Sequence, residues 1–488
     1  MSLDKRMFCK NSFALLCLLG GVALPAVAHA QAAASSNHGF TPVGSPNPNH
    51  PTPSPTVQLK EEAQLDPDLS AMQPGNLFTP KKGKALTYWD GLVGHLTVET
   101  GIAGNPWTKT GRNFGQFYLD RANTVTLNQI MGSISHPISP VGHGYGIGFV
   151  FEAMYGSDAR FDPTIGMGSG NLTGQYQWAP TQAHIDVHLP WVFKHGIDVQ
   201  AGQMYGLMGA EGTPALARPF YSFNYGSDYI VPFETVGVVA TMHLSHHMDW
   251  LVGIDAGNST TFGRNGNNSR PKGYFGFTWH NLMNGKLNIN AIGHFGPQSN
   301  NGPTRVSSEG WNSAGIGPKA NGLMQYNADL LVTYHITKDL SVQAEGLFLH
   351  DDASRDDAYG VTGYLSWDVS KAFTLNARAE IFRDNTGAII SQYTGTMSYV
   401  NSLRNRPFSY FNAPPTTYGE LTVGGAYRPD LINRHLGKGT FTLRPEIRID
   451  KSLNGTRPFN RAGTVDNPVV THGTENMLTF NCDAVLGF

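Results

Sequence analysis

Two stretches near the C-terminal end of the chain carry charged side chains at alternate positions. In residues 441–450 arginines alternate with acidic residues, and residues 373–384 contain a shorter row of the same kind. Successive side chains of a β-strand point to opposite faces, so each row would occupy one face of a strand. The charged residues of the two rows are Arg378, Glu380, Asp384, Arg444, Glu446, Arg448 and Asp450.

The other face of each stretch is apolar, as Phe441, Ile447 and Ile449 illustrate. In a strand that crosses a membrane, an arginine on the lipid side costs roughly 2–4 kcal/mol near the bilayer centre. We therefore expect the charged faces to line a water-filled lumen, where a row of mixed charges selects solutes by charge and dipole. The alternative is that the rows form ion pairs that join neighbouring strands, and the two roles can coexist.

Other alternating stretches also have a polar face, whose members we expect to face the lumen. These residues are Glu99, Glu152, His184, Asp186 and His188. His184 and His188 would lie ~13 Å apart along one strand, which is too far for a shared metal ion. The serine, histidine and aspartate residues of the chain form no nucleophile motif. We therefore predict no catalytic residues, no metal and no cofactor.

The elements that position these residues follow from a hydrophobic period of two that begins near residue 85 and indicates β-strands. We count sixteen such stretches, with an error of about two. The stretches are about 9–13 residues long, which matches the length that a tilted strand needs to cross a bilayer. Their centres lie near residues 97, 130, 150, 185, 200, 238, 254, 276, 291, 330, 345, 364, 377, 424, 446 and 482.

The links between these stretches alternate in length, which favours a membrane barrel over a soluble sandwich. Long links such as 207–230 and 384–417 alternate with short ones such as 370–371. Outer-membrane barrels have short periplasmic turns, long external loops and an even number of strands. The last stretch ends in the aromatic residue Phe488, which resembles the C-terminal assembly signal of such barrels. We predict an all-β fold, a closed antiparallel transmembrane β-barrel over residues 85–488.

The N-terminal region has a different character. Residues 1–30 combine a basic start, an apolar stretch and a small-x-small motif that ends at Ala30, as in a signal peptide that is cleaved there. Residues 31–84 are rich in alanine, serine, proline and asparagine, so we predict a disordered periplasmic leader. A formal net charge of −2 gives no basic face for a nucleic-acid partner.

Four segments resemble characteristic sequences of the OmpL-like β-barrel porin family. Residues 202–211 are similar to its Gly-Lys-aromatic…Gly-x-Glu segment, with Gln203 in place of the usual basic residue. Residues 232–238 resemble its Pro-Phe-x-x-x-Gly-aliphatic strand start. Residues 378–387 match its Arg-x-Glu-x-Phe-x-Asp-x-x-Gly signature, and residues 444–450 match its penultimate-strand signature.

The resemblance extends from about residue 91 to the C-terminus and implies an outer-membrane porin through which small hydrophilic solutes diffuse passively. Outer-membrane lipid and lipopolysaccharide would surround it, and the barrel-assembly machinery would insert it. General porins with sixteen strands usually form homotrimers and fold their third external loop inward. By that analogy the link 207–230 would form a constriction; the alternative is an ordinary external loop. The candidate constriction residues are Glu211, Arg218, Tyr221, Tyr225 and Asp228.

Two other classes of function remain open at this point. An outer-membrane barrel enzyme would place a serine or histidine and a carboxylate near the outer rim of the barrel. A soluble exported β-protein, which binds carbohydrate or scaffolds the envelope, would be recovered without detergent.

Overall fold

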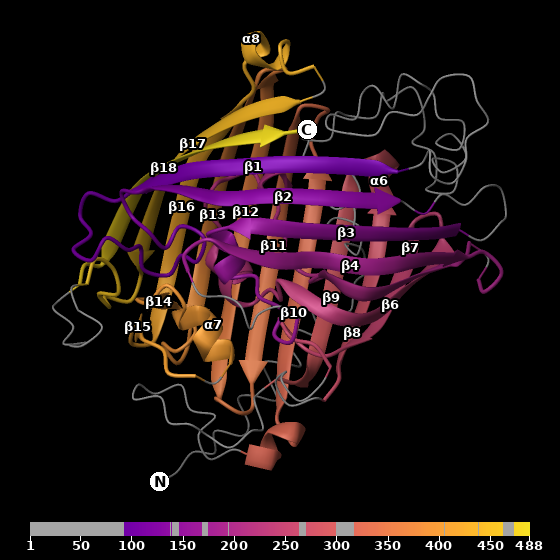
Figure 1. The fold of residues 1–488 in the computed structure, drawn as a ribbon, viewed down its shortest axis with the longest axis horizontal. Helices are drawn as coiled ribbons and strands as arrows, with labels where there is room; N and C mark the ends of the chain where they lie inside the picture. The colour runs from indigo at the N-terminus through magenta and orange to yellow at the C-terminus, as the bar shows by residue number, and fades with distance from the viewer. Residues whose placement is uncertain are drawn as a thin grey trace.

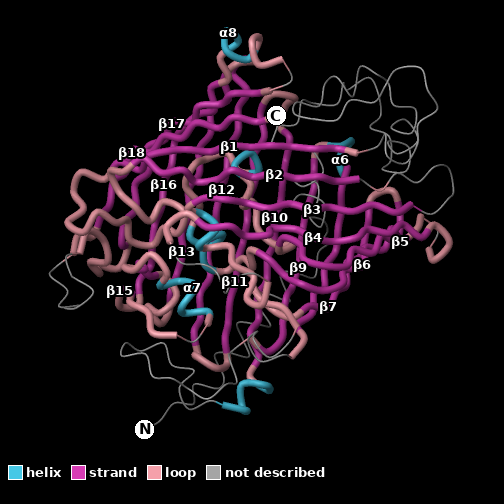
Figure 2. The backbone as a smooth tube through the Cα atoms, viewed as in Figure 1, coloured by secondary structure: helices cyan, strands magenta, loops and turns pink. Residues whose placement is uncertain are grey.

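The computed structural model describes residues 92–136, 138, 146–167, 174–193, 195–262, 270–298, 317–404, 406–437, 439–461 and 473–488. The predicted signal peptide and leader, residues 1–30 and 31–84, lie outside these residues. The described chain forms a closed antiparallel barrel of sixteen strands, whose front and back walls cross in Figure 1 and whose strands stand out in Figure 2. Each predicted strand centre falls within one of these strands, so the predicted fold and strand count are confirmed.

Strands that follow one another in the chain are neighbours in the barrel. The one exception in the described wall is β13, which pairs with β16 because β14 and β15 form a separate two-stranded sheet within a loop. The barrel strands are β1 (Val93–Gly104), β2 (Val125–His136), β3 (Gly146–Gly156), β4 (Gln177–Leu189), β5 (Ile197–Tyr205), β6 (Glu234–Ser245), β7 (Met248–Asp255), β8 (Lys272–Asn281), β9 (Leu287–Pro297), β10 (Met324–His335), β11 (Leu340–Asp351), β12 (Asp356–Ser370), β13 (Phe373–Asp384), β16 (Thr416–Tyr427), β17 (Thr440–Ser452) and β18 (Asn476–Gly487).

The barrel closes where the first strand meets the last. β1 and β18 are antiparallel, with Thr97 opposite Gly487 and Gly104 opposite Phe480. The terminal residue extends this seam, because the backbone N–H of Leu96 donates to the carbonyl of Phe488 at 2.9 Å and the N–H of Phe488 donates to the carbonyl of Leu96 at 2.8 Å. The seam therefore leaves neither β1 nor β18 with a free edge in the described wall.

The period of two in the sequence becomes an outer apolar face and an inner polar face. Ile381, Ile447 and Phe480 point outward and are 60%, 50% and 48% exposed, although their side chains are large and apolar. The adjacent residues Glu380, Arg448 and Asn481 point inward and are buried. An exposed apolar belt around a closed sheet is what a barrel presents to lipid.

The two ends of the barrel differ in the length of their connections, as predicted. At the turn end, β6 is joined to β7 by two residues, and so is β12 to β13. The helices α6 (Leu282–Gly285) and α8 (Asp430–Asn433) lie in turns at this end, and α8 and the C-terminus are at the top of Figure 1. No helix among the described residues is both long enough and apolar enough to span a membrane.

The loop end carries the longer connections, which contain short elements of their own. Loops between strands bring aromatic side chains into the barrel, where Phe117, Phe161 and Phe223 belong to one buried cluster. A second cluster includes Tyr225, Leu347 and Phe382. The elements in these loops are η2 (Asp158–Arg160), η4 (Ala215–Ala217), α5 (Tyr225–Tyr229), η5 (Gly317–Gly322), β14 (Ser391–Tyr393), α7 (Ser398–Leu403) and β15 (Tyr410–Asn412).

Candidate functional site

The link between β5 and β6, residues 206–233, enters the barrel and packs against its inner wall; we call it the inner loop. It contains η4 and α5, and nearly all of its residues are buried or half-buried. Phe220, Tyr221 and Tyr225 are each at most 1% exposed. The five candidate constriction residues, Glu211, Arg218, Tyr221, Tyr225 and Asp228, all lie on this loop and are all buried.

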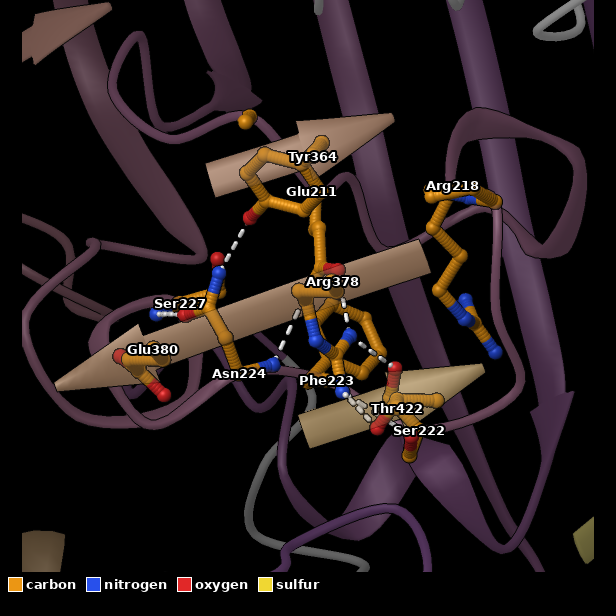
Figure 3. A network of polar contacts seen from close by, with 12 residues as sticks. Glu211, Arg218, Ser222, Phe223, Asn224, Ser227, Tyr364, Arg378, Glu380 and Thr422 are labelled. Atoms are coloured by element: carbon orange, nitrogen blue, oxygen red, sulfur yellow. Dashed lines mark hydrogen bonds and ion pairs between the residues drawn. The ribbon is translucent and has the colours of Figure 1, made fainter. Parts of the chain in front are cut away.

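Arg378 of β13 joins the inner loop to the wall at the centre of Figure 3. Its guanidinium forms ion pairs with Glu211 of the loop at 2.6 Å and with Glu420 of β16 at 3.1 Å. It also donates to the backbone carbonyl of Ser222 at 2.7 Å. All three side chains of the ion-pair network are fully buried, so its stability depends on every charge having a partner.

The two arginines of β17 make contacts of the same kind at other points of the loop. Arg444 donates to the carbonyls of Ala215 at 2.6 Å and Arg218 at 2.8 Å, and it pairs with Asp483 of β18 at 2.5 Å. Arg448 donates to the carbonyl of Phe223 and pairs with Asp450. A planar guanidinium has five donors, so it can bind a carboxylate and a carbonyl at once.

The acidic residues of the same strands bind the opposite backbone groups of the loop. Glu446 accepts from the N–H of Tyr221 at 2.9 Å and Ser222 at 3.2 Å. Glu380 accepts from the N–H groups of Tyr225 and Gly226, at 2.7 and 2.9 Å, at the start of α5. The wall therefore satisfies both donors and acceptors of a loop backbone that is removed from water.

Two acids on β10 and β11, which follow β13 and β12 in the barrel wall, hold the beginning of the loop. Asp329 of β10 accepts from the N–H of Gly209 at 2.8 Å, and Glu345 of β11 accepts from the N–H of Ala210 at 2.6 Å. The anchors of the inner loop thus extend along the barrel wall from β17 to β10. The sequence analysis missed both residues, because the inner faces of their strands also include leucines, Leu331 and Leu347, so that neither strand shows a charged row.

Charged groups of the loop itself are compensated inside the lumen. Burial lowers the pKa of Arg218, but the carboxylates of Glu99, 2.8 Å away, Asp158 and Asp483 together raise it, so it lies above its usual value. Burial raises the pKa of Glu211, although Arg378 and the N–H of Asn224 oppose this effect. Burial also raises the pKa of Asp228, which accepts from the N–H of Phe117.

The remaining candidate residues occupy other parts of the inner face. Glu99 lies at the seam and binds Arg218 and Arg444. Asp384 accepts from the backbone of residues 387 and 390, so it fixes the loop that follows β13. Glu152 accepts from the hydroxyl of Tyr205 at 2.5 Å. His184, Asp186 and His188 line β4 near the turn end, away from the inner loop, and His184 is 3.0 Å from Asp186.

The ring of Tyr221 packs closely against the backbone of β1, and this contact fixes one side of the inner loop. The ring of Tyr221 lies against Gly101 of β1, where an added Cβ would come within 2.5 Å of the ring carbon Cζ. The hydroxyl of Tyr221 donates to Asn128 of β2 at 2.8 Å. A residue larger than glycine at position 101 would therefore push this ring away from the wall.

A closed sixteen-strand barrel with an apolar belt, a charged inner face and a loop folded into its lumen defines the outer-membrane porin class. The family described as "Putative beta-barrel porin-2, OmpL-like" matches residues 92–480. The chain belongs to this family, and its function is that of an outer-membrane porin. The family resemblance predicted from four sequence segments is confirmed.

Comparison with individual proteins gives more distant similarities. No curated protein matches the sequence. The outer-membrane channel DcaP of Acinetobacter baumannii is 11% identical, with a TM-score of 0.48, and the match covers 84% of this chain and 99% of DcaP. OmpF of Salmonella typhi is 10% identical (TM-score 0.48; 82% and 99% covered). An anion-selective porin of Comamonas acidovorans is also 10% identical (TM-score 0.44; 81% and 99% covered).

Proposed function

We propose that this porin passes small hydrophilic solutes by diffusion and that the inner loop sets the size limit. The observation that carries this proposal is the network of bonds between wall charges and the loop backbone. Arg378, Glu446 and Glu345 hold the loop from different strands, so solute entering the barrel meets a fixed obstacle rather than a mobile flap. The charged residues of β13 and β17 would therefore act mainly by holding the constriction in place.

Positive charge is distributed unevenly around the barrel wall near the turn end. On the turn-end side of the inner loop, a cavity of about 30 Å³ is lined by Arg218, Arg428 and Arg444 together with hydroxyl and amide side chains. The facing strands β4–β7 carry no arginine or lysine, and β8 has only Lys272, at its loop end. We infer a transverse field across the periplasmic mouth, with the positive side on β12–β17.

Conductance in planar bilayers tests the proposal. The purified barrel should give discrete current steps, and Arg428→Ala should shift the reversal potential in a salt gradient towards cation preference, because Arg428 lines the cavity. Arg434→Ala is the matched control, since Arg434 lies in the exposed turn after α8. Absence of current steps from a heat-modifiable, folded barrel would refute channel activity. Equal shifts in the two variants would refute the proposed field.

The remaining features of the protein extend this proposal. We propose export through a signal peptide that is cleaved near Ala30, insertion by the barrel-assembly machinery through the strand that ends in Phe488, and contact with lipopolysaccharide at the loop end. Assembly as a homotrimer is a further proposal. N-terminal sequencing of the mature protein and cross-linking in detergent test cleavage and assembly.

A further inference from the structure

A group of histidine and aspartate side chains lies on the inner face of β4–β6 near the turn end, apart from the inner loop. His188, Asp198 and His243 come from three adjacent strands, and their ligand atoms lie within 4.8 Å of one another. His188 is directly opposite Asp198 in the strand register. Among the described residues, this is the one group with three such ligands that the structure brings together.

The distances between the ligand atoms are somewhat shorter than those between two ligands of one bound zinc ion. Nδ1 of His188 lies 2.6 Å from one carboxylate oxygen of Asp198, and Nε2 of His243 lies 3.0 Å from the other. Two ligands at about 2.0–2.1 Å from a zinc ion in tetrahedral geometry are separated by roughly 3.3 Å. A metal ion would take the place of the protons that these hydrogen bonds now share, with small outward movements of the ligands.

The arrangement behind the ligands also matches a metal site. His243 uses its other ring nitrogen, Nδ1, to bind Asp249 of β7 at 2.9 Å, and Asp249 in turn lies 3.4 Å from His280 of β8. A carboxylate behind a histidine fixes the ring and directs its other nitrogen to the metal. The ring of His188 lies over Gly196, where an added Cβ would come within 2.5 Å of the ring carbon Cε1.

Access and charge favour a cation at this position. The side chains of His188, Asp198 and His243 are 11%, 28% and 14% exposed, so they are neither sealed in the wall nor fully solvated. No arginine or lysine occurs in β4–β7, whereas Asp186, Asp198 and Asp249 lie on their inner face near the turn end. Two imidazoles and one carboxylate with open positions suit zinc and similar divalent transition-metal ions.

We propose that His188, Asp198 and His243 bind a divalent transition-metal ion at the periplasmic mouth of the barrel, with Asp249 as the positioning residue behind His243. The sequence analysis missed this site because it considered pairs on one strand, whereas these ligands come from three. Binding does not require the barrel to conduct, so it can fail or succeed independently of the proposed channel function.

Calorimetric titration of the untagged, detergent-solubilised full barrel with Zn²⁺ tests the proposal. We expect one ion per barrel, and we expect Asp198→Asn or His243→Gln to abolish this binding. Asp249→Asn should retain one site with about 10- to 100-fold weaker affinity, because it removes only the group that orients the ligand. Titration with Co²⁺ should give visible absorption bands in the wild type that Asp198→Asn removes.

Matched controls separate this site from other histidines nearby. His246 and His247 lie in the turn between β6 and β7. His184 lies on β4, farther from the turn end than His188. The variant His246→Gln/His247→Gln and the variant His184→Gln should bind Zn²⁺ as the wild type does. Loss of binding in either control, or unchanged binding in a heat-modifiable Asp198→Asn barrel, would overturn the assignment.

Discussion

At the scale of single residues, the inner wall recognises the backbone of the inner loop more than its side chains. Arg378 and Arg444 each bind carbonyls of the loop while they neutralise carboxylates of the wall. Lysine could not replace them, because its ammonium group lacks the planar fork that binds two such partners in fixed directions. Loop side chains that make no contact with the wall can consequently vary without loss of these backbone anchors.

The contact between Gly101 and Tyr221 gives a prediction at this scale. Gly101→Ala should displace the Tyr221 ring, because its Cβ would lie 2.5 Å from ring carbon Cζ. We expect a loss of about 1–3 kcal/mol in the free energy of unfolding, as is usual for overpacking, together with a larger single-channel conductance. Denaturant titration and bilayer recordings measure the two effects.

The matched variant for this test is Gly132→Ala, since an added Cβ at Gly132 of β2 meets no atom within 4 Å. It should behave as the wild type does. If Gly101→Ala has the stability and conductance of Gly132→Ala, the Tyr221 ring is not held against β1.

At the scale of elements, three external loops pack on one another through buried groups. Tyr118, from the loop between β1 and β2, stacks on Phe223 of the inner loop with ring centres 4.7 Å apart. Its hydroxyl donates to Asp162 at 2.9 Å, in the loop that follows β3. Burial raises the pKa of Asp162 to about 8, and the nearby charge of Asp158 adds to this effect.

This raised pKa predicts a pH dependence of loop packing. A carboxyl with a raised pKa in the folded protein stabilises the packed loops fully below its ordinary value of 3.8, and this stabilisation is lost as the pH rises through about 8. As the pH rises from 6 to 9, we therefore expect the external loops to be cleaved faster by proteases and the channel currents to become noisier. Asp162→Asn should weaken this dependence.

Asp430→Asn, in the exposed turn that contains α8, serves as the control and should keep the full pH dependence. A dependence of the same size in Asp162→Asn and in the wild type would show that another group titrates in this range.

The strands could be predicted from the sequence, but most of the loop contacts could not. The alternation around Arg444 and Arg448 is local, and it sufficed to place both residues on an inner face. Their partners in the loop are the carbonyls of Ala215, Arg218 and Phe223, and every residue has a carbonyl. No residue type therefore marks these positions, and their proximity depends on closure of the whole barrel.

At the scale of the whole molecule, the apolar belt makes a prediction about lipid. Ile447 points outward near the middle of β17, whereas Leu431 lies in the α8 turn and is 74% exposed. Ile447→Arg should cost roughly 2–4 kcal/mol of stability in lipid vesicles, and Leu431→Arg about 0–1 kcal/mol. Equilibrium unfolding in urea measures both, and equal costs would contradict the placement of β17 against lipid.

The seam between β1 and β18 has a consequence for the order in which the protein is made. β1 is the first strand of the barrel along the chain and β18 is the last, so the wall has a gap beside β1 until β18 has been made. Until then, β1 has one open side, where another polypeptide could add a strand. A chain of this topology therefore keeps an unpaired strand edge at β1 throughout the synthesis of the strands from β2 to β17.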